Sequence, residues 1–155
     1  MKIKSGYTLI EILVALTIIG LLFSFGYANF RDFSRRQVVK DTAKGIQGDL
    51  RLAQGNAMTG KKPEGCNATL DSYSFNRSSS TRYTIDANCG AAIIIVKDVS
   101  LPSGITLSVP SPNPLKFKVL GQGTNIGASN WVLTLTQVGT ANTVAVTVTG
   151  GGEIK

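Results

Sequence analysis

The stretch that decides the architecture is the N-terminal one, MKIKSGYTLIEILVALTIIGLLFSFGYANF, residues 1–30. Two lysines and a Ser-Gly pair precede an apolar run, and the 19 residues from 12 to 30 carry no charge. At about 1.5 Å per helical residue, such a segment covers roughly 28 Å, close to the ~30 Å hydrocarbon core of a bilayer. We therefore predict a helix over residues 7–28 that is able to cross a membrane.

Three interpretations of this stretch compete. The first is a secretory signal cut after Ala28, because Gly26 and Ala28 satisfy the small-residue rule for cleavage. The second is a plain single-span anchor, and the third is a leader cut before the apolar run. Glu11 argues against the first two, because a carboxylate at the edge of an apolar helix costs roughly 2.5–3.5 kcal/mol on insertion scales. The helix dipole favours an acid at this position, so Glu11 alone does not decide.

The motif GYTLIE, residues 6–11, followed by ILVALTIIGLL, resembles the N-terminus of type IV pilins. That family has a Gly, a cleavage point, an aromatic residue, then Thr-Leu-Ile-Glu and an apolar helix. The resemblance implies cleavage between Gly6 and Tyr7 by a membrane prepilin peptidase, and N-methylation of the new terminus at Tyr7. The usual aromatic residue is Phe, and this chain has Tyr.

The resemblance also implies a role for Glu11 in subunit assembly. Glu11 would pair with the N-terminal amine of a neighbouring subunit, or with its own, and so set the axial register, because an unpaired charge is expensive in low dielectric. The implied partners are the prepilin peptidase and N-methyltransferase, other pilins or pseudopilins through the N-terminal helix, and lipid of the inner membrane.

The implied location is a single-pass inner-membrane precursor whose globular domain faces the periplasm or the exterior, and then a pilus or pseudopilus. The positive-inside rule alone points the other way, because five basic residues between 31 and 44 outnumber the two lysines of the leader. We assign the orientation that the leader motif implies, with the globular domain outside the cytoplasm.

Residues 29–60 continue the helix with an amphipathic pattern. One apolar stripe steps by three and four residues, which is typical of a helix face that packs on a core: Val39, Ala43, Ile46, Leu50, Ala53 and Ala57. We expect the opposite face to be solvated: Arg36, Lys40, Lys44, Gln47, Asp49, Arg51 and Gln54. The predicted organisation is a cleaved leader (1–6), a membrane or filament-core helix (7–28), its amphipathic continuation (29–60) and a β domain (61–155).

After residue 60 the spacing of apolar residues changes from a period of 3.6 residues to a period of 2. Each short run of alternating apolar residues is bounded by Gly, Pro, Asn or Ser. We predict strands at 72–75, 82–86, 91–99, 104–109, 116–120, 131–137 and 143–149. Four prolines between 102 and 114 confine that segment to turns or a sheet edge. The Gly-rich run 121–127 has no helix after it and is predicted to be a turn rather than a phosphate loop. The fold class is therefore α+β: one long N-terminal helix packed on a small antiparallel β domain.

Cys66 and Cys89 are the only cysteines, and in an exported domain they most simply form a disulfide. Closing a loop of this size stabilises by about 3 kcal/mol. The polar run 76–82 inside this loop is expected to be exposed. The chain has no histidine, and two cysteines are too few for a thiolate zinc site. We therefore predict no enzyme activity, no metal site and no cofactor.

Residues 49–62, DLRLAQGNAMTGKK, resemble the helix end in FimT-type minor pilins and in the H-type pseudopilin of type II secretion. Members of the FimT group resemble DNA-uptake pilins, some with Gly-Arg-x-Arg near the C-terminus. Here Gly152 matches, whereas Glu153 and Lys155 stand at the two arginine positions. The net charge is +7, and 14 − 9 = +5 after loss of residues 1–6.

We therefore predict a minor pilin or pseudopilin that does not bind DNA specifically. Apart from the C-terminus, Arg77 and Arg82 form the one basic patch away from the membrane that we consider for DNA binding. A DNA-uptake pilin and a secreted β domain with an ordinary signal peptide are the alternatives.

Overall fold

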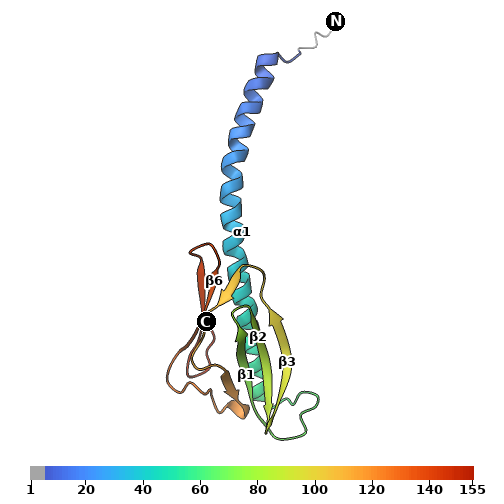
Figure 1. The fold of residues 1–155 in the computed structure, drawn as a ribbon, viewed down its shortest axis with the longest axis vertical. Coiled ribbons are helices and arrows are strands. Elements are labelled where there is room, and N and C mark those ends of the chain that lie inside the picture. Colours follow the sequence, from blue (N-terminus) through green and yellow to red (C-terminus); the bar gives the residue numbers. More distant parts are fainter. Residues whose placement is uncertain (1–5) are drawn as a thin grey trace. The chain divides into compact units, whose positions relative to one another are not determined.

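The computed structural model describes residues 6–155, and for residues 24–29 it describes the backbone alone. One helix, α1 (Leu9–Thr59, 51 residues), is followed by seven strands and a short 3₁₀ turn (Figure 1). The chain divides into two compact units, Met1–Gln37 and Val38–Lys155, and the division falls within α1. The second unit therefore contains the last part of α1 together with all of the strands.

Both ends of α1 follow the chemistry of the local sequence. The helix begins directly after Thr8, whose carbonyl oxygen accepts the first helical hydrogen bonds. It ends at Thr59, and Gly60 follows with φ +63°, a left-handed conformation that favours glycine at a helix C-terminus. The amide of Lys61 donates to the carbonyl of Asn56 at 3.0 Å and closes the last turn.

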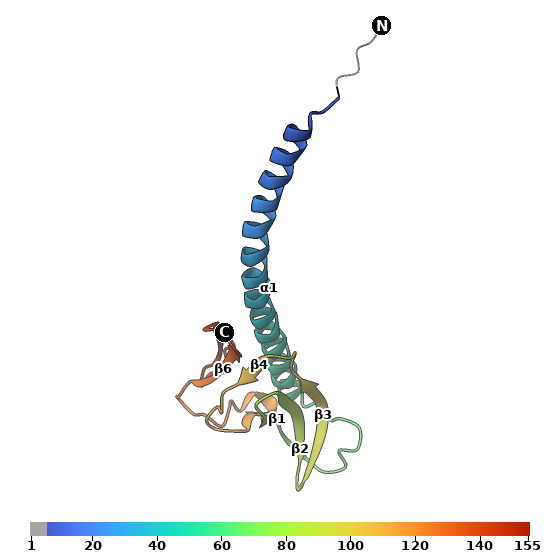
Figure 2. The ribbon, with the colours of Figure 1, turned by 45° about the horizontal axis from the view of Figure 1, so that its top comes forward.

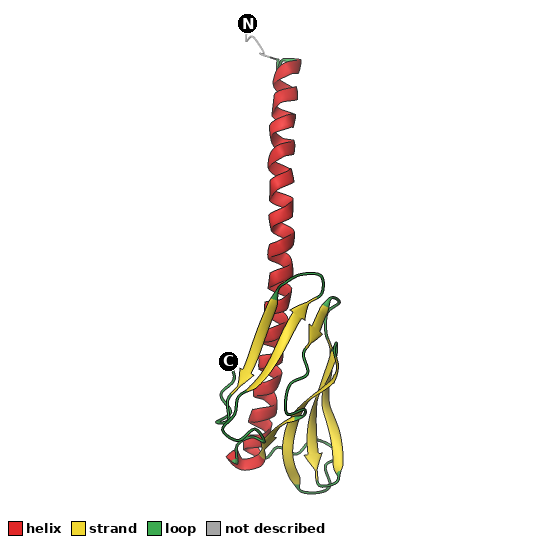
Figure 3. Cartoon of the chain, turned by 60° about the vertical axis from the view of Figure 1, so that its left-hand side comes forward, coloured by secondary structure: helices red, strands yellow, loops and turns green. Residues whose placement is uncertain are grey.

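The strands form two antiparallel sheets (Figures 2 and 3). The first has the order β3-β2-β1-β5, with β1 at Leu70–Ser79, β2 at Arg82–Cys89, β3 at Ala92–Ser100 and β5 at Leu115–Lys118. The second has the order β4-β6-β7, with β4 at Ile105–Leu107, β6 at Trp131–Gln137 and β7 at Thr143–Val148. Each predicted strand overlaps one of these seven, and the proline-rich segment contributes the short edge strand β4.

The polar run 76–82 was expected to be exposed, and Ser78, Ser80, Thr81 and Arg82 are exposed, but the run is not a free loop. Strand β1 continues to Ser79 and β2 begins at Arg82, so the run forms most of a tight hairpin. The run pairs with the start of β2, with Asn76 opposite Thr84 and Arg77 opposite Tyr83, and a distant segment adds further bonds. The amide and carbonyl of Arg77 both bond to the side chain of Asn113, at 2.9 and 3.1 Å, and the Arg77 guanidinium donates to the carbonyl of Leu107.

The apolar stripe of α1 packs on the β domain, as predicted, and its core includes strands of both sheets. All six of its residues are at most 3% exposed, and they share one core with the apolar residues of six strands. Three aromatic rings join the two sheets: Phe75 stacks on Tyr83 at 4.8 Å between ring centroids and meets Trp131 edge-on at 5.5 Å. The Trp131 indole donates to the carbonyl of Pro112 at 2.9 Å, so its buried N–H is satisfied.

The face predicted to be solvated includes one buried residue, Asp49, and two half-buried ones, Gln47 and Gln54. Asp49 is buried, and its carboxylate accepts hydrogen bonds from the Tyr83 hydroxyl at 2.7 Å and from the Lys97 ammonium at 2.6 Å. Gln54 is half-buried and donates to the carbonyl of Gly152 at 2.7 Å. Burial and the bond to Asp49 raise the pKa of Tyr83, so the phenol keeps its proton. These contacts fix the helix to β2, β3 and the C-terminal segment.

The opposite side of the first sheet carries a row of small polar side chains around Asp86. By register, Asp86 lies opposite Ser74, and Asn76 and Thr84 share its side of the sheet. Asp86 is only 4% exposed, and its Oδ1 atom has no hydrogen-bond partner among the described residues. Burial raises the pKa of Asp86.

Among the residues that the structure describes, no helix combines the length and hydropathy that crossing a membrane requires. The predicted span of 7–28 includes residues 24–28, whose side chains lie outside the described set. The membrane-spanning role of this segment stays a prediction.

Removing the Asp49 carboxylate should destabilise the 38–155 unit. Asp49→Ala leaves the buried Tyr83 hydroxyl without its acceptor and Lys97 without its counter-ion, so we expect a loss of about 2–3 kcal/mol in the free energy of unfolding. Urea titration of the full chain in detergent, followed by the fluorescence of Trp131, measures it, since this is the single tryptophan. Lys44→Ala, an exposed change on the same helix, should stay within about 0.5 kcal/mol. Equal effects of the two variants would contradict this account.

The burial of Asp86 should make stability depend on pH. Its pKa is higher in the folded than in the unfolded chain, so its contribution is fully present below about pH 4 and is lost as the pH rises through the folded value. Asp86→Asn stays neutral and escapes this loss. We therefore expect the stability of the variant, relative to the native chain, to increase between pH 3 and pH 7 in urea titrations. A constant difference would show that Asp86 titrates normally.

Candidate functional site

The N-terminal segment places the predicted cleavage point just outside the helix. Gly6, Tyr7 and Thr8 lie before α1 and are exposed, so the peptide bond between Gly6 and Tyr7 is not held in a helical hydrogen-bond ladder. Exposed, non-helical backbone of this kind is what a protease requires. Residues 1–5 of the predicted leader, with both of its lysines, lie outside the described residues.

Thr8 determines where the helix starts. Its hydroxyl accepts a hydrogen bond from the amide of Glu11 at 3.4 Å, and its carbonyl accepts from the same amide at 3.1 Å. Thr8 is therefore the N-cap, and Glu11 is the third helical residue, which is the Thr-x-x-Glu arrangement of a capping box. Thr8 was not predicted to have a role of its own, although Thr-x-x-Glu before an apolar run is a recognisable sign of a helix N-terminus.

Tyr7 and Glu11 face the same side of the helix start. Together with Ile12, Ala15 and Leu16 they line an open hollow of about 370 Å³. Large apolar side chains between Leu9 and Phe23 are 47–83% exposed, on every side of the helix. The isolated chain thus presents one acid at the beginning of a helix whose apolar surface has no cover among the described residues.

The two cysteines form the predicted disulfide. Cys66 and Cys89 are bonded, with their Cα atoms 5.7 Å apart. Cys89 ends β2 and is buried, whereas Cys66 lies in the segment between α1 and β1 and is half-buried. The bond ties that segment to the first sheet.

The residues considered for DNA binding are engaged with other groups. The Lys155 ammonium pairs with the Glu153 carboxylate at 3.1 Å. Arg82 forms a two-pronged ion pair with Asp98, which lowers the pKa of that carboxyl, and Arg77 bonds to the carbonyl of Leu107. The C-terminus folds back on β7, with the amide and carbonyl of Lys155 both bonded to Thr147.

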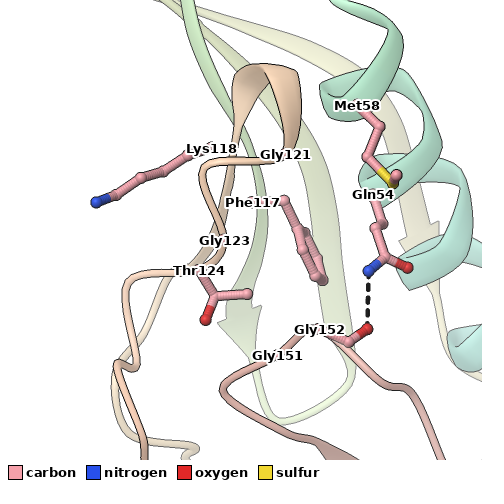
Figure 4. A pocket seen from close by; sticks show the side chains of 9 residues that line it. All are labelled: Gln54, Met58, Phe117, Lys118, Gly121, Gly123, Thr124, Gly151 and Gly152. Atoms are coloured by element: carbon pink, nitrogen blue, oxygen red, sulfur yellow. Dashed lines mark hydrogen bonds between the residues drawn. The ribbon is translucent and has the colours of Figure 1, made fainter.

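One small pocket lies at the C-terminal end of α1, within the 38–155 unit. It has a volume of about 150 Å³ and is lined by Gln54, Met58, Phe117, Lys118, Gly121, Gly123, Thr124, Gly151 and Gly152. Figure 4 shows the Phe117 ring opposite the side chains from α1, and the Lys118 side chain directed away. No sequence motif identifies this pocket, because helix, loop and C-terminus each supply part of its wall.

Residues 1–27 match the family model described as the prokaryotic N-terminal methylation motif. No curated protein and no solved structure matches the chain. The resemblance of residues 49–62 to FimT-type pilins and the H-type pseudopilin therefore has no support from a relative. The matched segment contains Gly6, Tyr7, Thr8 and Glu11, the residues that form the exposed bond, the helix cap and the lone acid. It is a type IV pilin-like leader, and it indicates a protein of the type IV pilin or pseudopilin type.

Proposed function

We propose that the chain is a minor pilin or pseudopilin, a structural subunit of a type IV pilus or of a type II secretion pseudopilus. The methylation motif at the start of an apolar helix is the observation that carries this proposal. The motif specifies removal of the leader and methylation of the new N-terminus. The helix behind it, once anchored in the inner membrane, enters a filament whose other subunits cover it.

The exposed apolar helix supports an assembled state. The large apolar side chains between Leu9 and Phe23 are 47–83% exposed on every side of the helix and are not covered by the described residues, whereas lipid or neighbouring helices would bury all of them. Glu11 then needs a cation in this apolar setting. The free amine of Tyr7 on a neighbouring subunit, or on the same one, supplies it, which explains why an acid stands at a costly position.

We infer that DNA is not a specific partner. Phosphate binding depends on clustered cations that release counter-ions. Lys155 pairs with Glu153 and Arg82 pairs with Asp98, so two of the three cations considered have an acidic side chain beside them that opposes the approach of a phosphate. These pairs favour a filament subunit over a DNA-uptake pilin.

The mature protein should begin at Tyr7. Cleavage after Gly6 leaves 155 − 6 = 149 residues, with the disulfide and with one methyl group on the terminal amine. Intact-mass spectrometry of the protein from its producing cells measures this. A chain that begins at Asn29 would be 22 residues shorter, and it would identify a secretory signal and end the pilin proposal.

Glu11→Ala should impair assembly and spare the membrane precursor. Removing the charge makes insertion of the helix easier, because an acid in a membrane helix costs roughly 2.5–3.5 kcal/mol. Incorporation should fall about tenfold or more in sheared filament fractions, which immunoblotting quantifies against the membrane fraction. Glu64→Ala, another exposed acid outside the motif, is the control and should assemble normally. Normal incorporation of the Glu11 variant would refute the assembly role.

A further inference from the structure

A second recess of the 38–155 unit, which we call the α1–β3 groove, is lined by residues of α1, of β2 and of the end of β3. Its volume is about 390 Å³, and most of its lining residues are apolar or small: Val38, Thr42, Gly45, Val99, Leu101 and Pro102. A cavity of about 150 Å³ holds a ligand the size of benzene, so this groove has room for an aromatic side chain. An open apolar recess of this kind is where another surface can be buried.

Gly45 keeps the groove open at a cost to the helix. Glycine in a helix interior is less favourable than alanine. A Cβ atom at Gly45 would meet no heavy atom within 4 Å, so no close contact within the described chain requires a glycine there. Because Gly45 lines the groove, a larger residue would fill part of it. The glycine therefore suits a partner that approaches α1 at this point.

Phe33 is an exposed aromatic side chain that a lipid environment does not explain. It is 66% exposed. It lies beyond the uncharged run 12–30, among charged residues: Arg31, Asp32, Arg35 and Arg36. Lipid would cover the ring only by taking in these charges as well, which is costly. An apolar recess on a protein surface covers the ring and leaves the charges at its rim.

The segment around Phe33 matches the groove in spacing and in charge. Arg36 follows Phe33 by three residues. Asp41, the one charged residue of the described groove lining, follows Val38 by the same number. Residues three apart share a helix face, so a parallel helix that places its Phe33 against Val38 brings its Arg36 level with Asp41. Among the residues that the structure describes, no acid pairs with Arg36, and opposite charges favour this encounter.

We propose that the α1–β3 groove is the docking site for Phe33 of a second, parallel copy of this chain, with Arg36 of that copy beside Asp41. The two complementary features stand at different places in one sequence, so the contact is heterologous. Each copy gives its Phe33 to one neighbour and offers its groove to another. Contacts of this type build open helical assemblies when their rotation does not close a ring. The proposal deepens the filament role and rests on it for the parallel orientation of the copies.

A photoreactive ring at position 33 tests the contact in the full chain. Replacing Phe33 with p-benzoylphenylalanine keeps an aromatic ring, and light couples that ring to what it touches. Producing cells make this chain together with an affinity-tagged copy, and mass spectrometry locates the cross-links in irradiated membranes and sheared filaments. We expect position 33 to be joined to the groove of the tagged copy, within residues 38–45 or 99–102. The same analogue at Val138, in the exposed β6–β7 turn, is the control and should not reach the groove.

Two matched changes in the tagged copy test the groove itself. Gly45→Leu fills it and should lower the yield of the cross-link about tenfold. Gly55→Leu lies ten residues further along α1, outside the groove lining, and has the same free space around its Cβ position. It should leave the yield unchanged. Both changes place a better helix former in α1, so neither should lower stability in urea titrations.

A charge exchange tests the second contact. Arg36→Asp in the photoreactive copy should lower the yield about threefold, because it places two acids together, and Asp41→Arg in the tagged copy should restore it. An exchange that restores nothing would overturn the pairing of Arg36 with Asp41. A cross-link from position 33 to a different protein, or to another surface of the tagged copy, would overturn the docking site. So would a groove cross-link that Gly45→Leu leaves unchanged.

The filament role and the docking site fail separately. A chain that is present in sheared filaments but whose position 33 does not reach the groove would refute only the docking site. A groove cross-link in membranes, from cells whose sheared filaments lack the chain, would refute only the filament role.

Discussion

The folded domain depends on the burial of a single stripe along α1 between Val39 and Ala57. A two-sheet domain of this size must cover two apolar sheet faces, and one helix does so for both, because its stripe belongs to the same core as six of the strands. Three further contacts hold the helix and the segment after it against the sheets. Asp49 fixes the helix to β2 and β3, Gln54 fixes it to the C-terminal segment, and the disulfide ties down the segment that follows the helix. The stripe therefore sets the position of both sheets and of the small pocket at the helix end.

The strongly periodic parts of this fold could be read from the sequence. The six stripe residues, the seven strands, the edge position of the proline-rich segment and the disulfide all rest on local spacing, turn residues or cysteine count, which are properties of short segments. The GYTLIE motif is equally local, and for that reason both its resemblance and its helix cap are visible without a structure.

Features that depend on distant partners could not be read in this way. Asp49 sits at the border of the helix stripe, and its burial depends on Tyr83 and Lys97, which are 34 and 48 residues away. The side chain of Asn113, 36 residues from Arg77, bonds to both backbone groups of Arg77 and so links the β1–β2 hairpin to the proline-rich segment. The pocket draws its wall from three separate segments. Periodicity describes one segment at a time, so it misses each of these.

The division of the chain at Gln37 and Val38 means that one uninterrupted helix is subject to two kinds of selection. Substitutions after the division affect the stability of the single folded molecule, since the core begins at Val39. Before the division, none of the described residues belongs to that core, so substitutions there act mainly on contacts with what surrounds the helix. The two halves can thus diverge at different rates, and a domain of new shape could be grafted behind an old N-terminal helix without repacking either one.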